Sequence, residues 1–130
     1  MYKLQTKEVV LGGQTLTVSE ASNLAETKRY MLISEAEKKW ENVDIEGIEA
    51  RATHYLETLL YPTLLACTTG NVPTLEDFLN SIPPSESDIW VDTARELNPR
   101  WFPNSRAQTP EEKVAELEKN VERQTSSSPD

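Results

Sequence analysis

The side chains best suited to chemistry in this chain are its single histidine and single cysteine, His54 and Cys67. A thiol activated by an imidazole is a nucleophile for acyl transfer, provided that the two groups lie within hydrogen-bond reach. Both residues fall in one predicted helix, where thirteen positions of about 100° each place them roughly 220° apart. The spacing therefore predicts a solvated His54 and a core-packed Cys67 rather than a catalytic pair.

Other arrangements that could bind a metal ion or a phosphate are incomplete. One histidine and one cysteine do not form a zinc site without carboxylates. The acids Asp44, Glu46 and Glu49 miss the spacing of a calcium loop. The Gly12-Gly13 pair lacks the surrounding residues of a phosphate-binding loop. We therefore predict no catalytic, cofactor-binding or metal-binding residue, no cofactor and no enzymatic activity.

The charge balance excludes one class of partner. The 130 residues include 13 basic and 22 acidic side chains, with a net charge of −9 and no basic cluster. Nucleic acid requires a positive footprint, so binding to it is not expected. The longest apolar run, residues 59–67, is broken by Pro62 and is too short to span a membrane. A single thiol and no signal-peptide pattern favour a reducing, cytoplasmic setting.

The first half of the chain predicts a hairpin and two helices. Residues 4–11 and 15–18 favour strands on either side of Gly12-Gly13, a pair typical of tight hairpin turns. Ser19 is the predicted N-cap of a helix that reaches Trp40. Its predicted apolar face consists of Ala21, Leu24, Ala25, Met31, Leu32 and Ala36.

A second helix is predicted to begin at Asp44. Pro62 must kink or end this helix, and a helix that resumes after it would stop at Gly70. The apolar stripe predicted for the second helix consists of Ile45, Ile48, Ala52, Tyr55, Leu56, Leu59 and Leu60.

Residues 74–103 predict two short helices followed by a turn. Thr74 and Asp77 match a capping box, Pro83-Pro84 ends the first helix, and Ser85 is the predicted start of the second. The Asn98-Pro99 pair is a stop signal, after which the two rings of Trp101 and Phe102 lie between prolines.

The predicted fold is mainly α (α+β), with an N-terminal β-hairpin, a small bundle of about four helices, and then a C-terminal helix and disordered tail. Residues 1–103 form the predicted domain. Residues 104–130 are predicted to form a charged helix and a flexible tail. The helix starts at Thr109-Pro110 and has a narrow seam of Val114, Leu117 and Val121, which could support self-association.

The apolar side chains near the end of the predicted domain are the candidate partner-binding residues. They are Trp90, Leu97, Trp101 and Phe102. Trp is enriched in interface hot spots because it combines a large apolar area with one polar group. The same rings could instead pack against the long helices of this protein's own core, and the sequence leaves both alternatives open.

Taken in order, residues 3–103 resemble the tail assembly chaperones of long-tailed bacteriophages. The resemblance rests on VVLGGQTLTV, SEASNLAE, YLETLLYPTLLACTTG, TLEDFLNSIP and DIWVDTARELNPRWF. It implies a protein of the host cell cytoplasm that binds the helical, apolar tape-measure protein and keeps it soluble. It also implies recruitment of tail tube subunits and absence from the finished particle.

Two alternatives from other classes remain. A structural adaptor would stay in the phage particle, and mass spectrometry of purified virions would distinguish it from a chaperone. A small enzyme is the second alternative, which an activity lost on His54→Ala would support.

Overall fold

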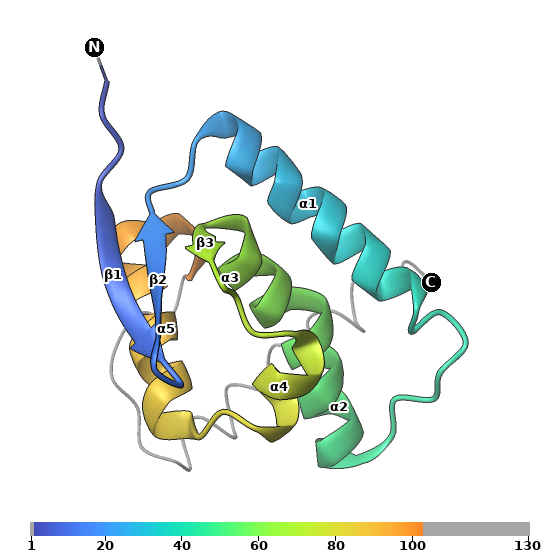
Figure 1. Cartoon of the computed structure of the whole chain (residues 1–130). Coiled ribbons are helices and arrows are strands. Elements are labelled where there is room, and N and C mark those ends of the chain that lie inside the picture. The colour runs from blue at the N-terminus through green and yellow to red at the C-terminus, as the bar shows by residue number, and fades with distance from the viewer. Residues whose placement is uncertain (1, 103–130) are drawn as a thin grey trace.

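The structure, a computed structural model, describes residues 2–102 as a mainly helical α+β domain (Figure 1). Its strands are β1 (Thr6–Leu11), β2 (Gln14–Ser19) and β3 (Thr68–Gly70). Its helices are α1 (Asn23–Lys38), α2 (Gly47–Tyr55), α3 (Tyr61–Ala66), α4 (Leu75–Asn80) and α5 (Pro84–Leu97), with a π-helical turn η1 (Leu56–Leu60) and a 3-10 turn η2 (Pro99–Trp101). The predicted fold class is confirmed. The predicted C-terminal helix and tail, residues 104–130, lie outside the described residues.

The N-terminal hairpin forms where the glycine pair predicts it. Gly12 and Gly13 have φ angles of 56° and 79°, the left-handed region that a two-residue primed turn requires. β1 and β2 pair antiparallel, from Thr6 opposite Ser19 to Leu11 opposite Gln14. Alternate side chains of the two strands point into the core, namely Val9, Leu11, Leu16 and Val18.

A third strand takes the place of the predicted helix end. The helix stops at Ala66 rather than at Gly70, and β3 pairs antiparallel with β2. Three residues are too few to show an alternating pattern, so no local sequence pattern predicts this strand. The sheet order is β1-β2-β3, and α5 packs against the hairpin (Figure 1).

The N-cap of α1 is Ser22 and not Ser19, the serine that was predicted. Ser19 is the last residue of β2, and the N-cap is Ser22, whose Oγ accepts a 3.0 Å hydrogen bond from the Ala25 N–H. Both serines suit a cap, and pairing with β1 uses the first of them. The helix ends at Lys38, two residues before Trp40.

Residues 47–66 form one helical run that passes through Pro62. Proline lacks an N–H and its ring crowds the carbonyl four residues earlier. The preceding turn, η1, is π-helical, with the Tyr61 N–H bonded to the Leu56 carbonyl five residues back. This extra residue rotates the helix face, so the predicted single stripe is divided. Leu56 and Leu60 pack against the core, whereas Ile48 is 53% exposed.

The two predicted short helices, α4 and α5, are present. The predicted N-cap of α4 is confirmed, and the predicted N-cap of α5 is wrong. Thr74 Oγ1 accepts a 3.2 Å hydrogen bond from the Asp77 N–H, as the capping box predicts. α5 begins at Pro84 with Pro83 as its N-cap, so Ser85 lies inside the helix and does not cap it. Proline in a first helical turn loses no bond, because those N–H groups have no partner within the helix.

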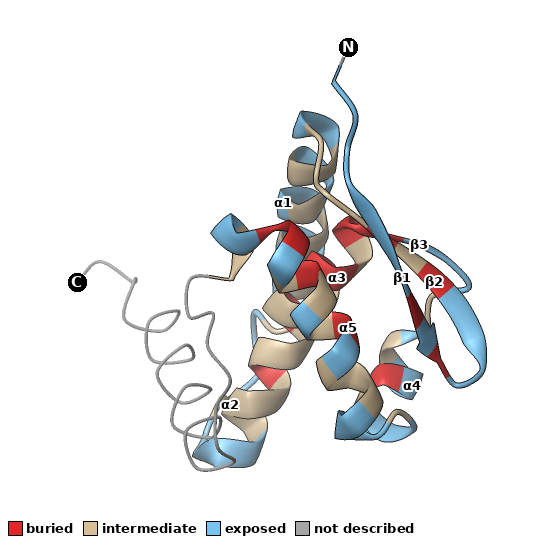
Figure 2. Ribbon diagram, turned by 90° about the vertical axis from the view of Figure 1, so that its left-hand side faces the viewer, coloured by how far each residue is buried: buried red, intermediate tan, exposed pale blue. Residues whose placement is uncertain are grey.

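The core lies where α3, α5 and the sheet meet, as the buried segments in Figure 2 indicate. Buried Asn98 holds one edge of it together. Its Oδ1 accepts a 2.7 Å hydrogen bond from the Ala21 N–H, and its Nδ2 donates a 2.9 Å hydrogen bond to the Ser19 carbonyl. The end of α5 is thereby joined to the segment between β2 and α1.

Candidate functional site

Two of the four predicted partner-binding residues lie in the core. Trp90 is 0% exposed, and its Nε1 donates a 3.0 Å hydrogen bond to Thr68 Oγ1. The Phe78 ring meets it edge-on, with 6.0 Å between centroids. Leu97, seven residues after Trp90 on the same helix face and the last residue of α5, is also buried. A partner cannot reach either side chain in the folded domain, so the partner-binding role predicted for Trp90 and Leu97 is wrong for this state.

Trp101 and Phe102 lie half-buried at the edge of the core. The Arg29 guanidinium lies over the Trp101 ring, with 5.2 Å between its Cζ and the ring centroid. Arg29 Nε also donates a 2.9 Å hydrogen bond to Thr63 Oγ1. Arg29 therefore joins α1, α3 and η2 by cation–π and hydrogen-bond contacts. Trp101 is partly used inside the protein, and only its remaining surface is open to a partner.

Burial acts on the pKa of this arginine without removing its charge. The loss of solvent lowers the pKa of the Arg29 guanidinium, and neighbouring Tyr30, Glu26 and Tyr55 act in the opposite direction. Arginine remains protonated at any physiological pH because its ordinary pKa lies far above that range. The contact with the Trp101 ring is therefore permanently cationic.

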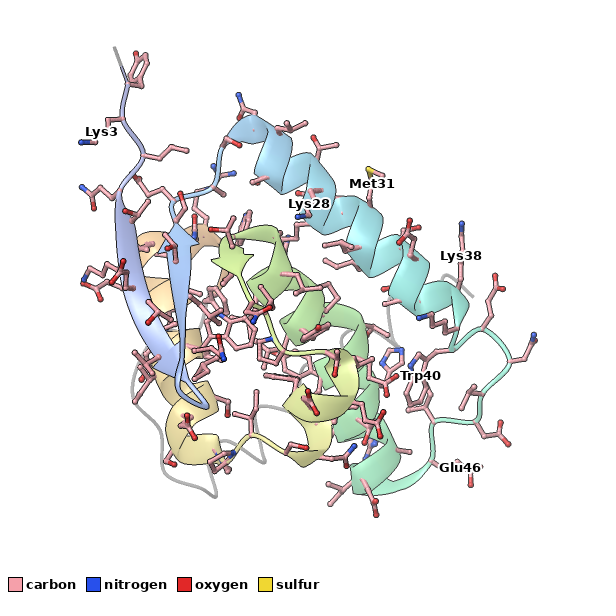
Figure 3. The ribbon with its side chains drawn as sticks, viewed as in Figure 1. Lys3, Lys28, Met31, Lys38, Trp40 and Glu46 are labelled. Carbon is pink, nitrogen blue, oxygen red and sulfur yellow. The ribbon has the colours of Figure 1, made fainter. Side chains whose placement is uncertain are left out.

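The helix α1 carries large apolar side chains that are exposed to solvent. Leu24, Tyr30 and Met31 are 79%, 60% and 59% exposed. The opposite side of α1 packs against α3 and η1, with half-buried Ala25, Arg29, Leu32 and Ala36. Figure 3 shows Met31 directed away from the rest of the domain.

The sequence prediction misplaced two of these side chains. Leu24 and Met31 were assigned to the apolar packing face together with Ala25 and Leu32. Residues seven apart share a helix face, whereas Leu24 and Ala25 differ by about 100°. Separating the two sets by angle would have shown that Leu24 and Met31 form a second apolar side.

The His54 prediction is also wrong, because the side chain is buried. The Trp40 ring packs edge-on against the His54 ring, with 5.1 Å between centroids. Trp40 Nε1 in turn donates a 2.6 Å hydrogen bond to Glu57 Oε2. As Figure 3 shows, Trp40 lies between the end of α1 and the helix that follows. The segment beyond α1 folds back over His54, which helical periodicity alone does not indicate.

Cys67 is buried, as predicted, at the end of α3. Burial raises the pKa of its thiol to about 11, against the opposing effect of hydrogen bonds that include one between the thiol and the Thr68 hydroxyl. The thiol is therefore protonated at neutral pH and a poor nucleophile. His54 and Cys67 lie at different levels of one helical run, about 20 Å apart along its axis.

Groups of three or more His, Cys, Asp or Glu side chains arranged to hold a metal ion do not occur within residues 2–102. In the same part of the chain, none of the helices combines the length and the apolar character needed to cross a membrane.

The chain matches no protein-family model, no curated protein and no solved structure. Its candidate site is therefore defined by its own surface, which consists of the outward side of α1 and the partly exposed rings of Trp101 and Phe102.

Proposed function

We propose that this protein is a phage tail assembly chaperone. In this role it binds the tape-measure protein in the host cell cytoplasm, keeps it soluble and helps to recruit tail tube subunits, without catalysing a reaction. The order of elements that resembles this family, residues 3–103, is one support. The second is a surface suited to holding an apolar helix.

The observation on which the proposal depends is the outward side of α1. The helix has 16 residues and is about 24 Å long. Leu24 and Met31, seven residues apart, lie on one line along it, and exposed Tyr30 lies about 100° round the helix from Met31. Apolar helices are recognised through anchors at this spacing. Large apolar side chains gathered on one helix side favour a protein partner over solvent.

The charge of the chain fits a holder of an apolar partner. Exposed Lys28 lies between Leu24 and Met31 on the outward side, and Lys38 follows at its end (Figure 3). The chain as a whole carries a net charge of −9. Mutual repulsion between such acidic proteins would keep chaperone–partner complexes dispersed.

Pull-down of a helical fragment of the cognate tape-measure protein tests the α1 surface. Leu24→Ser/Met31→Ser should lower the affinity about five- to thirtyfold, since two exposed apolar anchors contribute roughly 1–2 kcal/mol. Val10→Ser is the matched control, because Val10 is 57% exposed on β1. Circular dichroism should be the same for both variants. Equal capture by the two variants would show that α1 is not the binding surface.

The half-buried ring pair requires a separate variant. Trp101→Ala/Phe102→Ala should weaken capture of the same fragment if the exposed parts of these rings contribute to the contact. Undiminished capture by this variant, with an unchanged circular dichroism spectrum, excludes the pair and leaves α1 alone. Mass spectrometry of purified virions tests the role itself, since a chaperone is absent from them and a permanent adaptor is present.

A further inference from the structure

The free side of β1 is an unpaired strand edge. The sheet order β1-β2-β3 gives β1 one neighbour among the described strands, and Figure 1 shows it as the outermost strand of the domain. The Glu20 N–H donates a 2.8 Å hydrogen bond to the Gln5 carbonyl, so Gln5 directs its backbone groups toward β2. Backbone groups alternate between the two sides of a strand, so those of Thr6, Glu8 and Val10 point away from β2. Within residues 2–102, these groups have no hydrogen-bond partner.

Exposed apolar side chains accompany these backbone groups. Leu4 and Val10 are exposed, and side chains six residues apart in an extended chain lie on one face. The residues before β1 continue its direction, as Figure 1 shows. Proteins often block such edges with proline, a bulge or charge. β1 contains no proline and its register with β2 is continuous, so the charges of Lys7 and Glu8 decide which strand can pair with it.

The flank of α5 that borders this edge is also partly apolar. The Gly12 N–H donates a 2.7 Å hydrogen bond to Glu86 Oε1, and Lys7 forms an ion pair with Glu96. Ile89 lies three residues after the first of these acids and seven before the second, so it shares their side of the helix. It is exposed. A strand added at the edge of β1 would therefore cover Ile89.

The charges and apolar side chains disfavour two of the ways in which a second copy of β1 could pair antiparallel with the first. In a two-fold arrangement centred on Glu8, the Glu8 carboxylates of both copies lie directly opposite each other, which is destabilising. An arrangement centred on Val9 places Leu4 opposite Gln14 of the second copy, beyond its hairpin turn. Leu4 then has no apolar neighbour across the interface.

The arrangement centred on Lys7 matches the outward-facing side chains. Leu4 lies opposite Val10 of the second copy, and the two-fold axis repeats this apolar pair. Thr6 lies opposite Glu8 of the second copy, so the carboxylate meets a hydroxyl and not another acid. The edge is therefore complementary to itself in this register.

The charges near the two-fold axis compensate each other. Lys7 of one copy lies opposite Lys7 of the other, and each forms an ion pair with a Glu96 carboxylate. Two ammonium groups and two carboxylates therefore gather there. The net charge of −9 on each chain opposes association at longer range. Physiological salt screens that repulsion, because its Debye length is about 8 Å.

We propose that two copies of this chain pair antiparallel through their β1 edges, with Lys7 on the two-fold axis, and so join their two three-stranded sheets into one. The four pairs of outward-facing residues would exchange about eight backbone hydrogen bonds. In Figure 1, α1 and β1 lie on opposite sides of α3, so each copy keeps the outward side of α1 free. The inference does not depend on the proposed function, because it concerns contacts between copies of one chain.

Sedimentation equilibrium of the full-length chain at physiological salt tests the pairing. Dimers should form between about 1 and 200 µM. Glu8→Pro should raise the Kd of the dimer at least about tenfold, because it removes an outward N–H and leaves the pairing with β2 intact. Glu8→Gln retains the N–H and is the control. Val10→Lys should also raise the Kd, whereas Thr15→Lys, at the exposed position opposite Val10 on β2, should not.

Oxidative crosslinking identifies the register. Lys7→Cys should form a disulfide-linked dimer, because the Cα atoms of such a pair are about 4.5 Å apart and a disulfide spans about 4.4–6.8 Å. Glu8→Cys should crosslink at least about tenfold more slowly, because its counterpart lies diagonally across the interface. The unsubstituted chain is the blank, since its Cys67 is buried.

Three results would overturn the proposal. The first is a chain that remains monomeric at about 200 µM. The second is a dimer that Val10→Lys does not weaken although circular dichroism is unchanged, and this variant decides the matter if Glu8→Pro does not fold. The third is faster crosslinking of Glu8→Cys than of Lys7→Cys.

Discussion

Trp90 Nε1 donates a 3.0 Å hydrogen bond to Thr68 Oγ1, and both residues are buried. The bond joins α5 to the short strand β3, which in turn pairs with the hairpin. A large indole is therefore accommodated in the core with its one polar group satisfied. The arrangement explains why Trp90 is a structural residue in this fold and not a surface contact.

Thr68→Val should lower the free energy of unfolding by about 1–3 kcal/mol, because it leaves the buried Trp90 N–H without its acceptor. Urea denaturation followed by circular dichroism measures the loss. Thr69→Val is the control, since Thr69 is exposed on the same strand. Equal stability of the two variants would mean that the hydrogen bond contributes nothing.

Asn98→Asp should destabilise the domain by about 2 kcal/mol at neutral pH, since a carboxylate cannot donate to the Ser19 carbonyl and is buried with a charge. The other carboxylate oxygen of the variant can still accept the hydrogen bond that the Ala21 N–H donates to Asn98 Oδ1. The loss should shrink below about pH 5, where the new carboxyl takes up a proton and becomes a donor. Asn71→Asp, at an exposed position, is the control in urea titrations at both pH values. A loss that is independent of pH would contradict this account.

The Cys67 thiol should make stability fall at alkaline pH. Its ordinary pKa of 9.0 is raised to about 11 by burial, so the unfolded chain loses the proton first. The contribution is complete below about pH 9 and is lost as the pH rises to about 11. The difference between these pKa values corresponds to roughly 2–3 kcal/mol.

Denaturation from pH 7 to 11, compared with Cys67→Ala, isolates the thiol. Burial, and to a smaller extent Asp77, also raises the pKa of Tyr61, whose effect has the same sign and remains in both proteins. The variant should show a shallower decline. Parallel curves would mean that Cys67 titrates normally in the folded state.

Gly70→Ala should destabilise the β2–β3 pairing by about 1–3 kcal/mol. Gly70 has a φ of 112°, and an added Cβ would lie 3.3 Å from the Thr15 carbonyl oxygen. Gly47→Ala is the matched control, because its φ of 81° is also left-handed but nothing lies within 4 Å of an added Cβ. Thermal unfolding of both should show the larger loss at Gly70. An equal loss would mean that backbone strain alone, without crowding, determines the effect.

The sequence predicted those features that depend on a few adjacent residues. Gly12 and Gly13 specify the hairpin turn because only glycine adopts both left-handed φ values at low cost. Thr74 specifies the start of α4 because its hydroxyl satisfies an N–H that the helix leaves without a partner. These signals are local, so they hold whatever packs against them, and the order of a hairpin followed by helices follows from them.

The tertiary structure decided which apolar side chains face inward. Trp90 is buried because β3, too short to recognise in the sequence, brings the Thr68 hydroxyl to its indole N–H. Leu24 remains on the surface because α1 meets α3 and η1 through its other side. An apolar residue in a sequence has the same chemistry in a core and at an interface. Only the packing of distant elements distinguishes the two, and that packing leaves α1, not Trp90, as the surface open to a partner.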